Sequence, residues 1–140
     1  MKRLLRILIR WAVVIAYAGI IFHVSSLSQP IPITAFPVAI PPGVDKVIHF
    51  FEYAVLCFLL CRAVDVSSSW ELTGASTFGA NALFICFLCA SLYGLTDEIH
   101  QRYVPLRSCD GVDLVADAAG AATVAMLWPA VTARLPFLRR

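Results

Sequence analysis

The chain has 140 residues, of which 60% are hydrophobic and only 14% are charged, and its net charge is +2. About a quarter of the residues in a soluble domain are charged, and a soluble fold of this length could not bury so much apolar surface. The sequence also has no broad basic stripe and no motif that interleaves aromatic and basic residues, which argues against nucleic-acid binding. The composition therefore predicts a membrane protein.

The first predicted element is an apolar helix over residues 4–24. It is about as long as the 20 apolar residues that a bilayer core requires. A basic start and the small residues Ser25 and Ser26 resemble a signal peptide, but Arg6 and Arg10 interrupt the run and no A-x-A cleavage site follows. We therefore expect a spanning helix that is retained.

The next segment, residues 25–44, contains five of the eight prolines. This density excludes a helix interior and predicts an extended outer loop on the membrane surface or over the helices. Further spanning helices are predicted over residues 47–66, 77–95 and 112–131, with a second outer loop at 97–111. Because none of the apolar runs alternates with period two, we expect helices rather than barrel strands. The predicted fold class is all-α, a polytopic four-transmembrane-helix bundle in one domain over residues 1–140.

The lysines and arginines predict the orientation in the membrane. With four spans, eight of them fall on one side, and only Lys46, Arg102 and Arg107 fall on the other. Cytoplasmic loops carry the excess of basic residues. We therefore expect cytoplasmic N- and C-termini, with the proline-rich loop on the outer side.

Polar residues form a stripe on the outer half of each of the last three helices. The stripes consist of Asp45, His49 and Tyr53, then Tyr93, Asp97 and Gln101, then Asp110, Asp113 and Asp117. Spacings of three, four and seven place the members of each stripe on one helical face. All three reach about 10–12 Å inward, so the simplest packing turns them toward one another as a pocket open to the outside.

Several of these residues also have structural interpretations. Asp45 and Asp110 suit helix N-caps, Lys46 suits a headgroup anchor, and Tyr53 and Tyr93 suit interfacial aromatics. His49, Asp97 and Asp117 are different, because an ionisable group within a span is costly. These three are expected to be functional or tightly paired.

Two further predictions concern Arg107 and the cysteines. The carboxyl groups of the pocket need compensating charge, so Arg107 is expected to fold back and pair with Asp97, Asp113 or Asp117. Four cysteines lie deep in the second and third helices: Cys57, Cys61, Cys86 and Cys89. Four thiolates could bind a soft metal, but buried cysteine more commonly acts as a small hydrophobe, and no metal site is assigned to them.

The stretches "DKVIHFFEYAVLCFLL" and "YGLTDEIHQRYVPLRSCDGVDLVADAAGAA" resemble the VanZ-like family of small bacterial membrane proteins. The resemblance covers about two thirds of the chain. Its motif residues are Asp45, Lys46, His49, Tyr53, Tyr93, Asp97, Glu98, Gln101, Pro105, Arg107, Ser108, Asp113, Asp117 and Gly120. Leu106 stands where the family often has glycine, and Asp117 where it often has asparagine. The resemblance implies a multi-pass protein of the bacterial plasma membrane, in a family with some links to teicoplanin resistance.

Three functions remain open at this point. The first is binding or modifying an amphiphilic envelope molecule, with a membrane lipid or lipid-linked envelope precursor as partner. The second is a membrane-embedded hydrolase or transferase that uses an acid-base pair or a bound divalent cation. The third is a scaffold whose polar residues only fix helix packing. Neither a required cofactor nor an oligomeric state is predicted. The candidate catalytic residues are His49, Asp97, Glu98 and Asp117. The candidate ligand-binding residues are Asp45, Lys46, Tyr53, Tyr93, Gln101, Arg107, Ser108 and Asp113.

Overall fold

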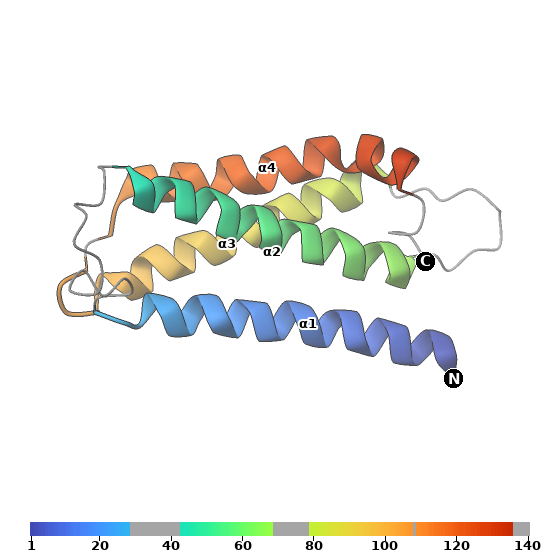
Figure 1. Cartoon of the computed structure of the whole chain (residues 1–140), viewed down its shortest axis with the longest axis horizontal. Helices are drawn as coiled ribbons and strands as arrows, with labels where there is room; N and C mark the ends of the chain where they lie inside the picture. Colours follow the sequence, from blue (N-terminus) through green and yellow to red (C-terminus); the bar gives the residue numbers. More distant parts are fainter. Residues whose placement is uncertain (29–42, 69–78, 108, 136–140) are drawn as a thin grey trace.

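The computed structural model describes residues 1–28, 43–68, 79–107 and 109–135. They form α1 (Lys2–Ser25), α2 (Val44–Ser68), α3 (Ala80–Gln101) and α4 (Gly111–Arg134). The helices lie side by side in alternating directions, and α1 begins at the same end of the bundle at which α4 ends (Figure 1). The described part of the chain contains no strand. The all-α, four-helix prediction is therefore confirmed.

All four helices are long and apolar enough to span a membrane. At 1.5 Å per residue, the 24 residues of α1 extend about 36 Å, more than the roughly 30 Å of a bilayer core. Only 11% of the most apolar window of α1 is buried. Large apolar side chains on every helix point outward, which suits a lipid surround. The protein is an integral membrane protein with four candidate spans.

The helix ends differ from the hydropathy pattern at the third helix. α3 continues to Gln101, so residues 97–101 are helical and the predicted loop 97–111 is too long. Hydropathy falls where acidic residues begin, but here those residues lie inside the bundle rather than in a loop. The proline-rich stretch 29–42 lies outside the described residues.

The bundle is built around α2. This helix packs most extensively against α4, and α3 packs against both of them, whereas α1 lies mainly against α2. The buried apolar core consists of Val14, Ile21, Tyr53, Leu56, Cys57, Cys61, Ala63, Cys86, Ala90, Ala121 and Trp128. The three helices that carry the motif residues are therefore those that pack most closely together.

Candidate functional site

Buried polar side chains gather where α1 and α3 end and where α2 and α4 begin, which we call the polar end. Here we define the polar cluster as Lys46, His49, Asp97, Glu98, Gln101, Asp113 and Asp117. All of them except Lys46 are at most 7% exposed. Burying ionisable groups in a span is unfavourable unless they are paired, so their contacts are informative.

His49 and Asp117 form a direct contact between α2 and α4. His49 Nδ1 lies 2.9 Å from Asp117 Oδ1, and both side chains are buried. The ring of Tyr53, one turn further along α2, lies nearly parallel to that of His49 with centroids 6.4 Å apart. A carboxylate that holds one ring nitrogen fixes the orientation and tautomer of an imidazole. The contact therefore has the geometry of an oriented acid-base pair.

Two glycines make room for this contact. A β-carbon at Gly94 on α3 would lie 2.7 Å from Asp117 Oδ2, and one at Gly120 on α4 would overlap the carbonyl oxygen of Phe50 on α2. Glycine lets helix backbones approach closely in membranes. Gly120 was included in the family motif, whereas Gly94 was missed as a site residue, although its place between Tyr93 and Asp97 was a usable signal.

Glu98 lies beside the His49–Asp117 pair. Its Oε2 accepts the backbone N–H of Asp110 at 2.8 Å, while Oε1 is buried without a hydrogen-bond partner in the described part of the chain. His49, Glu98 and Asp117 each place one ligand-type atom within 4.8 Å of the others, so this group could hold a metal ion.

Lys46 is bound by three carboxylates. Its ammonium group lies 2.8 Å from Asp45, 2.7 Å from Asp110 and 2.8 Å from Asp113, and it joins the beginnings of α2 and α4. Asp110 is the N-cap of α4 and accepts the N–H of Val112, as predicted. The same prediction for Asp45 is wrong, because Asp45 lies inside the first turn of α2. The Lys46 ammonium lowers the pKa of Asp110. The lysine is therefore an internal counter-ion of the site.

Asp97 connects α3 to α1. Its Oδ2 accepts hydrogen bonds from the Ser25 hydroxyl at 2.8 Å and from the Gln101 amide at 3.1 Å. Next to this, the Ser26 hydroxyl lies 3.0 Å from His100 Nε2. Asp97 is therefore buried at the polar end as predicted, but its hydrogen bonds go to α1 and α3. Ser25 was missed as a site residue because it looked like the small-residue end of an apolar leader.

The two motif tyrosines have different environments. The Tyr93 hydroxyl donates to the carbonyl oxygen of Ala18 at 2.7 Å and so ties α3 to α1. The Tyr53 side chain is fully buried, and its hydroxyl has no hydrogen-bond partner within the described residues. The hydroxyl proton of Tyr53 is therefore free to donate to a ligand, whereas that of Tyr93 is already used.

The predicted pairing of Arg107 is wrong in the described residues. Arg107 donates from Nε to the carbonyl oxygen of Leu27 at 3.2 Å and from Nη2 to that of Val24 at 3.4 Å. Val24 lies in the last turn of α1 and Leu27 just beyond its end, where the helix dipole favours a cation. The turn before it passes through Leu106 at φ 65°, where glycine is preferred, and this directs Arg107 toward α1. Ser108 lies outside the described residues.

The cysteines do not add to this site. Cys57, Cys61 and Cys86 are buried in the apolar core, while Cys89 is exposed on α3, so the four do not share one buried position.

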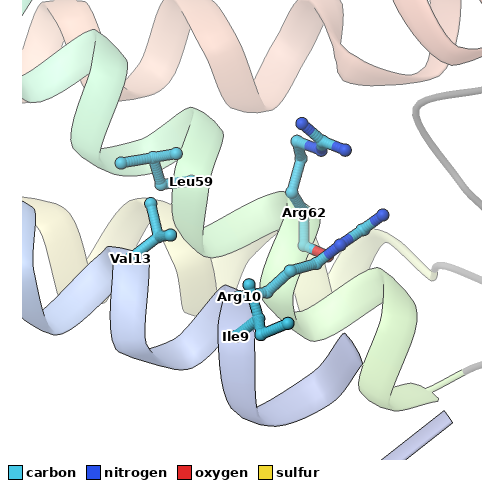
Figure 2. A pocket seen from close by; sticks show the side chains of 5 residues that line it. All are labelled: Ile9, Arg10, Val13, Leu59 and Arg62. Atoms are coloured by element: carbon cyan, nitrogen blue, oxygen red, sulfur yellow. The ribbon is translucent and has the colours of Figure 1, made fainter. Parts of the chain in front are cut away.

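A hollow of about 250 Å³ between α1 and α2 lies toward the other end of the bundle. It is lined by Ile9, Arg10, Val13, Leu59 and Arg62 (Figure 2). Arg10 donates to the carbonyl oxygen of Arg62 there. None of the predicted site residues line this hollow.

The comparisons with known proteins agree with the motif. The sequence profile of the VanZ/LLP1 family matches residues 5–132, nearly the whole chain. No curated protein and no solved structure matches the chain. The match extends through α1, beyond the helices that carry the motif residues. The chain belongs to the VanZ/LLP1 family.

Proposed function

We propose that the polar end binds the headgroup of an amphiphilic or lipid-linked envelope molecule, with the tail along the apolar helix faces. The supporting observation is the burial of four carboxyl groups at this one end: Asp97, Glu98, Asp113 and Asp117. Ionisable residues within a span are rare, and those that face the interior of a helix bundle typically mark a functional site.

The proposed orientation places the polar end on the outer side of a bacterial plasma membrane, with cytoplasmic termini. It rests on the eight-to-three distribution of basic residues. To test it, single cysteines at positions 35 and 68 are introduced into a variant without native cysteines. An impermeant thiol reagent applied to intact cells is expected to label position 35 only. Labelling at position 68 alone would reverse the orientation.

The biological setting that we propose is glycopeptide resistance. Some VanZ-like proteins are linked to teicoplanin resistance, and teicoplanin carries an acyl chain. The amphiphile is then either the antibiotic itself or the lipid-linked precursor that it targets. In either case the ligand has a polar part for the polar end and a tail for the bilayer.

A second candidate function is a membrane-embedded hydrolase or transferase. The observation that favours it is the 2.9 Å contact between His49 Nδ1 and Asp117 Oδ1, with Glu98 next to it. A histidine oriented in this way serves as a general base, and a neighbouring carboxyl group serves as a general acid. Asp97, held by Ser25 and Gln101, then helps to position the end of α3.

The test is mass spectrometry of the molecules that copurify with the protein in a mild detergent. The wild type is compared with His49→Ala and with His23→Ala, the same change at an exposed position on α1. We expect an amphiphile that is enriched with the wild type and with His23→Ala and is depleted with His49→Ala.

Incubating the protein with extracted membrane lipids separates binding from turnover. A product that forms with the wild type but not with His49→Ala selects the enzyme. Equal enrichment of every amphiphile in all three proteins would overturn both candidates and leave a scaffold.

A further inference from the structure

We propose that His49, Glu98 and Asp117 bind a divalent transition-metal ion of the Zn²⁺ or Mn²⁺ class. The last step of the proposal rests on the proposed function: the bound ion would contact an anionic headgroup. The three ligands come from three different helices, α2, α3 and α4. Binding would therefore connect the three most closely packed elements of the bundle.

The spacing of the ligand atoms supports the proposal. The three atoms all lie within 4.8 Å of one another. Zn²⁺ binds imidazole nitrogen and carboxylate oxygen at about 2.0–2.2 Å in tetrahedral geometry, so two ligands of one ion lie about 3.4 Å apart. Side-chain movements of under about 1 Å would complete the set. One imidazole and two carboxylates suit a transition metal better than Mg²⁺ or Ca²⁺, which prefer oxygen alone.

The free oxygen atoms are a second, independent observation. Glu98 and Asp117 are 1% and 0% exposed, yet Glu98 Oε1 and Asp117 Oδ2 lack a hydrogen-bond partner among the described residues. The other oxygen of each is fixed, by the Asp110 N–H and by His49 respectively. Each carboxyl group is thus anchored through one oxygen and unsatisfied at the other. An unsatisfied buried acceptor is unfavourable, and an ion would satisfy both.

The charge distribution also calls for a cation. Lys46 is already shared by Asp45, Asp110 and Asp113. Arg107, another cation at this end, donates to the carbonyl oxygens of Leu27 and Val24. Neither reaches Glu98 or Asp117 with an ion pair in the described part of the chain. Asp117 contacts His49, which is a cation only when protonated, so a divalent ion would supply positive charge that Lys46 and Arg107 do not.

The same distribution bears on the ligand. An anionic headgroup that approaches the polar cluster meets four buried carboxyl groups, and the cations that would attract it are occupied. A metal ion with three protein ligands keeps coordination positions open for water or substrate. A headgroup phosphate could take such a position. The ion thereby reconciles an acidic site with an anionic amphiphile.

The test measures metal binding by the full-length protein in detergent. After removal of metal with a chelator, the protein is dialysed against Zn²⁺, Mn²⁺ or Mg²⁺, and bound metal is measured by elemental mass spectrometry. We expect about one Zn²⁺ or Mn²⁺ per chain, because the three ligands form a single site, and no retained Mg²⁺. The wild type should also melt at a higher temperature with Zn²⁺ than with chelator.

Variants locate the site. Glu98→Gln and Asp117→Asn should weaken Zn²⁺ binding at least about 100-fold, the upper range for losing even an outer-shell partner. Glu52→Gln, the same change at a half-buried carboxyl group on α2 outside the ligand set, should bind as the wild type does. Because a variant could fail to fold, the chelator-dependent shift in the melting temperature of the wild type stands as a second readout.

Three outcomes would overturn the metal site. The wild type could retain neither Zn²⁺ nor Mn²⁺, its melting temperature could be the same with Zn²⁺ as with chelator, or Glu98→Gln could bind Zn²⁺ as tightly as the wild type. An amphiphile that copurifies with the metal-free protein in the presence of chelator would refute the role of the ion in headgroup binding and leave the proposed function intact. Stoichiometric Zn²⁺ without any amphiphile would support the metal site and count against the proposed function.

Discussion

Replacing Gly120 with alanine is expected to force α2 and α4 apart. A β-carbon there would lie 2.9 Å from the carbonyl carbon of Phe50 and 3.1 Å from the amide nitrogen of Ala54, and closer still to the Phe50 oxygen. Carbon atoms in ordinary contact are about 3.5–4.0 Å apart. The neighbours are backbone atoms, which cannot rotate away as a side chain can. The helices must therefore separate by about 1 Å.

The size of the effect follows from two opposing terms. Overpacking a well-packed contact costs about 1–3 kcal/mol, and the rigid neighbour places this site near the upper value. Alanine regains about 1 kcal/mol of helix propensity over glycine. The net expected loss is about 2 kcal/mol of unfolding free energy.

The assay is unfolding in mixed dodecylmaltoside and SDS micelles, followed by circular dichroism. Gly19→Ala is the matched control, because a β-carbon at Gly19 would meet nothing within 4 Å. That variant should be as stable as the wild type or up to about 1 kcal/mol more stable. If Gly120→Ala unfolds with the same free energy as Gly19→Ala, α2 and α4 do not cross as closely as described and the reasoning is refuted.

Two further predictions concern ties at the polar end. Lys46→Met should cost about 2 kcal/mol, below the range for fully buried pairs because Lys46 is partly exposed. Lys46 lowers the pKa of Asp110 in the folded protein. The stabilisation by this ion pair is therefore present above about pH 4 and is lost as the pH falls through the lowered pKa of Asp110. The difference in unfolding free energy between Lys46→Met and the wild type should therefore become smaller below pH ~4. A difference that does not change with pH would contradict this. Ser25→Ala removes the hydroxyl donor to Asp97 and should cost about 2 kcal/mol, against under about 0.5 kcal/mol for the exposed Ser26→Ala; equal losses would argue against the Ser25 contact.

The sequence predicted the fold well because lipid permits few alternatives. An apolar run of about 20 residues in a bilayer has to be a helix, so the number of helices followed from hydropathy alone. The burial of His49, Asp97 and Asp117 at one end also followed, because spacings of three and four fix a helical face. Their roles remain proposals.

The partners of the charged residues were harder to predict. Which carboxyl groups reach Lys46 depends on how α2 and α4 are aligned, and that alignment is set by the contact at Gly120. The target of Arg107 depends on the left-handed conformation of Leu106. Neither feature can be recognised from the spacing of residues. The sequence therefore predicted that Arg107 pairs with a carboxylate, whereas it donates to carbonyl oxygens at the end of α1.

The way in which α1 is attached has a consequence for biosynthesis. Its hydrogen bonds reach two later helices. Arg10 and Tyr17 donate to carbonyl oxygens of α2, whereas Ser25 and Ala18 are bonded to Asp97 and Tyr93 of α3. Because α2 is the next helix to leave the ribosome, α1 can pack against it early, and the contacts of α1 at the polar end form only after α3 is inserted. The small buried share of α1 allows this stepwise docking in lipid.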